Sequence, residues 1–191
     1  MTKDDLPVIA FSTREEWERW MDANHAKSPG VWLKLAKKGS GIASVTRDDA
    51  LEVALCYGWI DGQGSSIDES YWLQRFTPRT VRSKWSQKNR TAVLQLIESG
   101  AMQPAGLAAI KAAQADGRWE AAYASPANIT VPDDLKAALK HNKTASRNFD
   151  ALNARNRYAI LYRIQDAKRA ETRERRIEKY VTMLANGETI Y

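Results

Sequence analysis

The sequence predicts an α+β fold, in which a small, mostly antiparallel sheet with flanking helices precedes an all-helical C-terminal part. In the first 130 residues, amphipathic helical stretches are mixed with short segments of strand-like composition. Residues 118–130 have no periodicity and contain Ser125-Pro126, which is typical of an exposed linker. After this linker only helical patterns follow. We therefore expect an α+β domain over residues 1–130 and a helical domain over residues 131–191.

Residues 1–10 lack periodicity and are expected to form a loose, unstructured lead-in. Ser12 and Glu15 have the spacing of a capping box, so a helix is expected to begin there and to end near His25. The alternation of apolar and polar residues over 31–36 predicts a strand.

Thr46 predicts the start of a second helix, whose wide apolar stripe indicates burial and which Gly58 ends. Two strand-like segments on either side of a turn then predict a hairpin over residues 60–76. Three tryptophans fall on the predicted strands and are expected to line one sheet face, as core or as the wall of a ligand site. They are Trp32, Trp59 and Trp72.

After the hairpin, the pattern is helical. Ser83 or Ser86 is expected to cap a helix that ends before Gly100, and Pro104 to open another that Gly117 closes. Four further helices are predicted in the C-terminal part: one opened by Pro132, one around Phe149, one over 158–164 and one over 170–185.

Composition narrows the function classes. The chain has 191 residues with 43% hydrophobic content, which excludes intrinsic disorder. Its single cysteine, Cys56, lies in an apolar helical stretch and excludes a disulfide scaffold. The two histidines, His25 and His141, have no metal-ligand spacing, and no cofactor-binding motif is present, so neither a metal nor a cofactor is expected. Without a secretory or membrane-spanning pattern, the expected location is cytoplasmic and no membrane span is expected.

The net charge of +6 fits an anionic partner or a solvated basic surface. Residues 75–90 hold six basic side chains and no acid. Arginines beside a helix N-terminus form a natural anion site. Alternatively, Arg75 and Arg79 pair with Asp61 and Glu69 while Trp85 packs in the core. Asp61 could act as a general base or bind a ligand. Alternatively, it could have a structural role, in which it caps a turn or pairs with a nearby arginine.

Four groups of residues resemble the YdeI/OmpD-associated, or bacteriocin-protection, family. They are ALCYGWID at 54–61, RFTPR at 75–79, SxWSxxN at 83–89 and AKRxETRxRRI at 167–177. The resemblance extends from about Phe11 to Gly187. It implies a bacterial protein connected with envelope stress and tolerance of antimicrobial peptides, without a settled enzymatic activity.

The positions that match the motifs are candidate ligand-binding residues and a candidate basic ridge. The first set is Trp59, Asp61, Arg75, Arg79, Ser83, Trp85 and Asn89. The second set is Lys168, Arg169, Arg173 and Arg176. Their helix also carries acidic residues, so the alternative interpretation is a solvated helix face with alternating charges.

Three function hypotheses follow. The leading one is a stress or tolerance protein that binds a small anionic ligand or an acidic protein without catalysing a reaction. The second is an enzyme that uses Asp61, with arginines holding an anionic substrate. The third is a nucleic-acid binder that uses the basic C-terminal helix, but the acids interspersed there argue against a nucleic-acid partner. The sequence does not indicate an oligomeric state.

Overall fold

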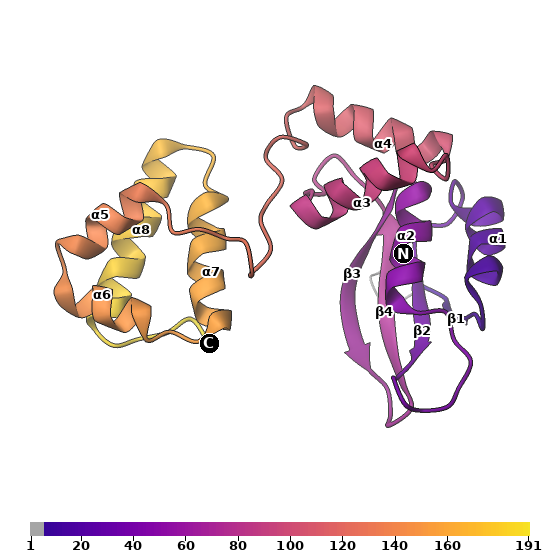
Figure 1. The fold of residues 1–191 in the computed structure, drawn as a ribbon, viewed down its shortest axis with the longest axis horizontal. Coiled ribbons are helices and arrows are strands. Elements are labelled where there is room, and N and C mark those ends of the chain that lie inside the picture. Colours follow the sequence, from indigo (N-terminus) through magenta and orange to yellow (C-terminus); the bar gives the residue numbers. More distant parts are fainter. Residues whose placement is uncertain (1–5) are drawn as a thin grey trace. The chain divides into compact units, whose positions relative to one another are not determined.

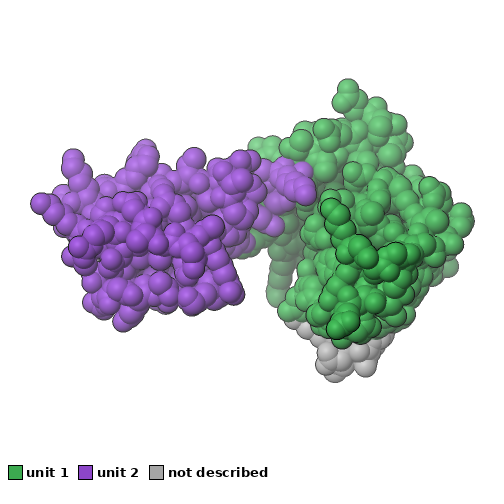
Figure 2. All heavy atoms as spheres, turned by 60° about the horizontal axis from the view of Figure 1, so that its bottom comes forward, with its two compact units in different colours: residues 1–85, 89–121 green, residues 86–88, 122–191 purple. Residues whose placement is uncertain are grey.

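The computed structural model describes residues 6–191, which divide into two compact units (Figures 1 and 2). Unit 1 comprises residues 1–85 and 89–121, and unit 2 comprises residues 86–88 and 122–191. The first five residues of the expected lead-in lie outside the described part. The predicted α+β class with a helical C-terminal region is confirmed. The units divide after Ala121, earlier in the chain than the expected boundary at Thr130.

Within residues 6–191, unit 1 contains a four-stranded sheet of order β1-β2-β4-β3. Its strands are β1 (Val8–Ala10), β2 (Val31–Ala36), β3 (Trp59–Ser66) and β4 (Tyr71–Pro78). The β1 strand pairs in parallel with β2, and the remaining pairs are antiparallel. The predicted hairpin is therefore confirmed. The expectation of an unstructured lead-in is wrong for residues 8–10, because a strand this short is held by pairing with β2 and shows no periodicity of its own.

The two faces of the sheet differ sharply. Val31, Leu33 and Leu35 are almost fully buried, whereas the alternating Trp32 and Lys34 are only half-buried. We call the first face inner and the second outer. The cross-strand register places Leu35 opposite Trp72 and therefore places this tryptophan on the inner face.

The three strand tryptophans do not share one face, contrary to expectation. By the alternation along the strands and the pairing of β3 with β4, Trp59 and Trp72 belong to the inner face. Trp32 pairs with Arg75 on the outer face. Composition identified the strands, but only the pairing register assigns a side chain to a face.

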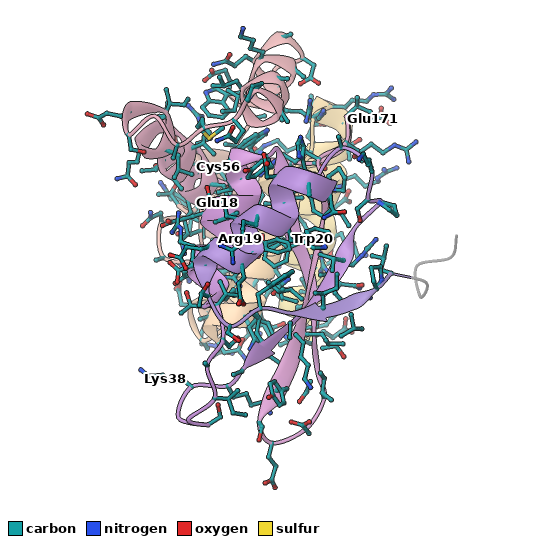
Figure 3. The ribbon with its side chains drawn as sticks, turned by 90° about the vertical axis from the view of Figure 1, so that its right-hand side faces the viewer. Glu18, Arg19, Trp20, Lys38, Cys56 and Glu171 are labelled. Carbon is teal, nitrogen blue, oxygen red and sulfur yellow. The ribbon has the colours of Figure 1, made fainter. Side chains whose placement is uncertain are left out.

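Two helices, α1 (Arg14–Asn24) and α2 (Arg47–Cys56), supply most of the remaining core of unit 1. Figure 3 looks at the unit from the side of α1, which lies in front of the strands. Trp17 on α1 is fully buried, and its ring centroid lies 5.6 Å from that of Phe76 on β4. The capping residue of α1 is Thr13 rather than Ser12, because Thr13 Oγ1 accepts from Glu16 N. The predicted cap of α2, Thr46, is confirmed.

The helix α4 (Pro104–Ala115) packs on α2 and follows α3 (Gln87–Glu98). Cys56, labelled in Figure 3, is 5% exposed, and burial raises the pKa of its thiol to about 11. This burial agrees with the apolar helical stretch predicted around Cys56, and a thiol with a raised pKa carries little of the reactive thiolate near neutral pH. The expected exposed linker begins later than predicted, because Trp119 is 5% exposed and packs against Trp85.

The helices of unit 2 are α5 (Asp133–Lys140), α6 (Lys143–Asp150), α7 (Ala154–Gln165) and α8 (Ala170–Ala185). All four correspond to predicted helices, and Asn142 and Asn153 cap α6 and α7. Their apolar faces form one core around Leu135, Phe149 and Ile160. Within residues 6–191 no helix has both the length and the apolar character needed to cross a membrane.

Candidate functional site

The basic segment 75–90 is organised by stacking between arginine and tryptophan in unit 1. The guanidinium carbon of Arg79 lies 3.6 Å from the ring centroid of Trp85. Trp85 meets Trp119 edge to face at 5.0 Å, and Arg90 lies 5.0 Å from the ring of Trp119. Such contacts stabilise a cation and fix its position. Sequence reasoning missed Trp119, which falls in the segment interpreted as an exposed linker.

Two arginines also hold the loop between β4 and α3. Arg79 Nη1 donates to Lys84 O at 3.1 Å, and Arg118 Nη1 donates to Ser83 O at 3.0 Å. Ser83 Oγ accepts from Thr80 N at 2.9 Å. Arg79, Ser83 and Trp85 thus lie together, and their contacts with one another and with the loop backbone give them a structural role whether or not a ligand binds.

Asp61 lies apart from this group. Its carboxylate pairs with Arg47 at 2.5 Å, and β3 places it on the inner face, whereas Arg75 lies on the outer face. Trp59 is 1% exposed and donates its indole N–H to His25 O. The candidate residues therefore do not meet in one cavity. The expected arginine partner of Asp61 is present, but it is Arg47 rather than Arg75 or Arg79.

The candidate basic ridge is divided between exposed and bonded side chains. Lys168 and Arg169 are exposed at the start of α8. Arg173 donates to both carboxylate oxygens of Asp134, which holds the pKa of that carboxyl below its usual value. Arg176 donates to Arg163 O. Two of the four ridge residues therefore tie α8 to neighbouring segments of unit 2.

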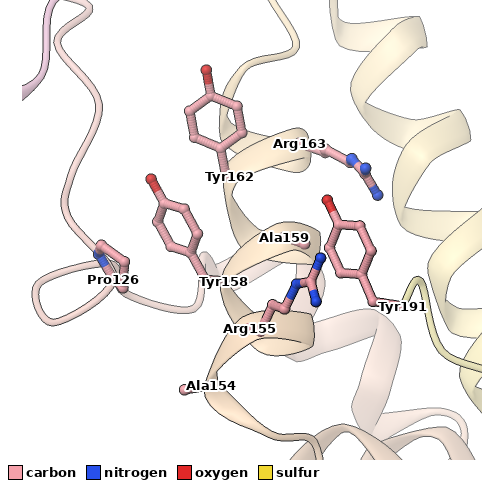
Figure 4. A pocket seen from close by; sticks show the side chains of 8 residues that line it. All are labelled: Pro126, Ala154, Arg155, Tyr158, Ala159, Tyr162, Arg163 and Tyr191. Carbon is pink, nitrogen blue, oxygen red and sulfur yellow. The ribbon is translucent and has the colours of Figure 1, made fainter. Parts of the chain in front are cut away.

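Unit 2 contains a cavity of about 550 Å³ that the sequence analysis did not predict (Figure 4). We call it the tyrosine–arginine pocket. Its lining consists of three tyrosines, two arginines and three small or cyclic residues: Tyr158, Tyr162, Tyr191, Arg155, Arg163, Ala154, Ala159 and Pro126. None of these described lining residues is acidic. The pocket therefore combines aromatic walls with two positive charges.

One face of α7 builds most of this pocket. Arg155, Ala159 and Arg163 recur at intervals of four, and Tyr158 and Tyr162 do so beside them, so all five project from neighbouring positions. In Figure 4 the two tyrosine rings lie between α7 and Pro126. The small Ala159 leaves space between the larger side chains. This spacing is the signal by which the sequence could have revealed the pocket.

Tyr191 closes the other side. Asn156, which is 2% exposed, accepts with its Oδ1 from the backbone N–H groups of Ile190 and Tyr191, both at 3.0 Å. The ring of Tyr191 then lies 4.0 Å from the guanidinium carbon of Arg155 and 5.8 Å from that of Arg163. One buried amide therefore positions both the ring and, through it, the two cations.

Tyr158 on α7 is suited to donate a hydrogen bond rather than to act as a base. Tyr158 Oη donates to Ala124 O at 3.3 Å. Burial raises the pKa of Tyr158, and the nearby phenols of Tyr123 and Tyr162 raise it further. Its phenol is thus protonated at neutral pH. The arrangement offers rings for stacking and cations for an anion, which is the chemistry of a binding site.

Comparison with known families agrees with the division into two units. The chain belongs to the family described as Domain of unknown function (DUF8412), whose model matches residues 9–109, just over half of it. The model described as Bacteriocin-protection, YdeI or OmpD-Associated matches residues 128–187 and confirms the resemblance. The first three motifs of that resemblance lie within residues 9–109, which match the domain of unknown function, and only the fourth lies within the match to the bacteriocin-protection family. Neither the curated proteins nor the solved structures contain a match.

Proposed function

We propose that this protein is a bacterial tolerance protein whose helical unit binds a small anionic ligand without transforming it. The observation that carries this proposal is the tyrosine–arginine pocket. A volume of about 550 Å³ lies in the range of small-molecule sites. The lining residues that α7 contributes lie in the part of the chain that matches the bacteriocin-protection family.

The charge of the pocket indicates the ligand class. Arg155 and Arg163 contribute two cations and no described lining residue opposes them. Guanidinium groups bind carboxylates and phosphates through paired hydrogen bonds. The tyrosine rings add apolar surface for a planar or aliphatic body. A small carboxylate or phosphate with an apolar body therefore fits the site best.

The same charge argues against direct capture of antimicrobial peptides. Membrane-active peptides of this kind are rich in lysine and arginine. Two arginines in the pocket would repel them. We therefore attribute protection to binding of an anionic ligand or an acidic segment of a protein, and not to sequestration of the toxic peptide.

Phenyl phosphate provides a direct test, because it combines an aromatic ring with a dianion. We expect calorimetry to detect binding of phenyl phosphate to the wild-type protein. The double variant Arg155→Ala, Arg163→Ala should bind it with an affinity lower by a factor of about ten or more. The reason is that a hydrogen bond to a charged group contributes about 1.5–3 kcal/mol. The cation phenethylamine should not bind.

The double variant Lys168→Ala, Arg169→Ala is the matched control, because it removes two charges from exposed side chains of the same unit. It should bind phenyl phosphate like the wild type. Equal binding by the wild type and the Arg155/Arg163 variant would refute the assignment to the pocket.

A further inference from the structure

The outer face of the sheet in unit 1 carries aromatic and basic side chains that the proposed function does not use. Trp32 and Lys34 project from β2 to this face, and Tyr71, Leu73 and Arg75 project from β4. All five are half-buried, so each keeps accessible surface. The face is therefore an aromatic and basic surface on a rigid sheet.

Aromatic and basic residues alternate on this face across the neighbouring strands β2 and β4. Arg75 lies opposite Trp32 in the register. Lys34 Nζ lies 3.8 Å from the ring centroid of Tyr71, which fixes the ammonium group over the sheet. Arg75 Nε is buried and has no hydrogen-bond partner among the described residues. Trp32 thus offers a half-buried ring on the face that carries both basic side chains, and Tyr71 positions the ammonium group of Lys34.

We propose that this outer face binds single-stranded nucleic acid. A base stacks on Trp32, while Lys34 and Arg75 contact the phosphates on either side of it. Proteins that bind single strands combine these two elements, aromatic rings for the bases and cations along the backbone. The described outer-face positions of β2 and β4 include no carboxylate that would repel phosphates. The acids that argue against nucleic-acid binding by the C-terminal helix therefore have no counterpart at these positions of the sheet.

The alternative partner is an acidic protein, which the two cations would also attract. The aromatic ring distinguishes the two, because stacking on a base needs Trp32, whereas attraction of carboxylates does not. A nucleic-acid site on α8, the third hypothesis from the sequence, would instead depend on Lys168 and Arg169 and not on residues of the sheet.

Fluorescence anisotropy of labelled oligothymidylate and oligouridylate, each of about 20 nucleotides, tests the proposal with the full chain. At about 50 mM salt we expect measurable binding, which weakens at about 200 mM. Trp32→Ala should weaken binding about tenfold, and Trp32→Phe, which keeps a ring, should restore most of it. In the double variant Lys34→Ala, Arg75→Ala, the slope of the logarithm of affinity against the logarithm of salt concentration should become shallower by about 1.4, because two phosphate contacts are lost.

The double variant Lys168→Ala, Arg169→Ala is the control and should bind both oligonucleotides like the wild type. Absence of binding to either oligonucleotide at low salt would overturn the proposal. So would equal affinity of the wild type and the Trp32→Ala variant, or loss only in the Lys168/Arg169 variant. If polyglutamate binds with the same affinity as the oligonucleotides, and the Trp32→Ala substitution does not change that affinity, the face would be assigned to an acidic protein instead. Should Trp32→Ala fail to fold, the Lys34/Arg75 variant and Trp32→Phe still decide the question.

Discussion

Replacing Trp17 with alanine is expected to destabilise unit 1 by about 3–5 kcal/mol. Trp17 is fully buried and stacks on Trp20 with a centroid distance of 5.2 Å. Its indole N–H also donates to Ala50 O at 3.0 Å and so joins α1 to α2. The alanine variant loses the packing and this hydrogen bond and leaves a cavity.

Urea denaturation measures this effect, and two further variants divide it into parts. Trp17→Phe keeps most of the packing but removes the hydrogen bond, so its loss of stability should be intermediate. Trp20→Ala should cost less than Trp17→Ala, because Trp20 is only half-buried. Equal stability of the Trp17→Ala and Trp20→Ala variants would contradict the central position of Trp17 in the core.

Replacing Gly106 with alanine should destabilise unit 1 by about 3 kcal/mol through a steric clash. A Cβ at this position would lie 2.2 Å from Cys56 O and 2.9 Å from Cys56 C. These are backbone atoms of α2, which cannot move without shifting the helix. The hydrogen bond from Gln103 N to Cys56 O, 3.1 Å long, joins the same two segments and would also be strained.

Gly62→Ala is the matched control for this prediction. It makes the same chemical change, but the added Cβ would lie 3.8 Å from its nearest neighbours, an ordinary contact. We expect its stability to remain within about 0.5 kcal/mol of the wild type. If the melting temperatures of the Gly106→Ala and Gly62→Ala variants agree, the close packing of α4 on α2 is refuted.

The helices were predictable because their signals are local. Thr46 and Asp49 stand at the spacing of a capping interaction, and Thr46 Oγ1 does accept from Asp49 N. At α1 the same reasoning gave a cap one residue too early, because Ser12 and Thr13 are both good caps. The structure resolves the choice through Glu16, whose carboxylate accepts from Ser12 N while its own N–H donates to Thr13.

Features that depend on distant pairing were not predictable from local pattern. The strand at residues 8–10 exists because β2 lies beside it. The burial of Trp119 depends on Trp85, more than thirty positions earlier in the chain. Likewise, only the register separates Trp32 from Trp59 and Trp72. In each case, the residue type was compatible with several environments.

The candidate site was only partly predictable for a related reason. The arginines of residues 75–90 stood out by charge, and the structure does group Arg79 with Trp85. The tyrosines of α7 belong to the pattern that predicts the helix over 158–164, but a helical pattern does not distinguish a core face from the wall of a pocket. Tyr191 contributes to the pocket only through Asn156, a contact between distant parts of the sequence.

Survival of cells exposed to a bacteriocin tests the central claim most directly, because it joins the tyrosine–arginine pocket to protection. Cells that produce the wild-type protein or the Lys168→Ala, Arg169→Ala control should survive equally well. Cells that produce the Arg155→Ala, Arg163→Ala variant at the same level should lose most of the protection. Full protection by the Arg155/Arg163 variant would contradict the claim that anion binding in this pocket underlies tolerance.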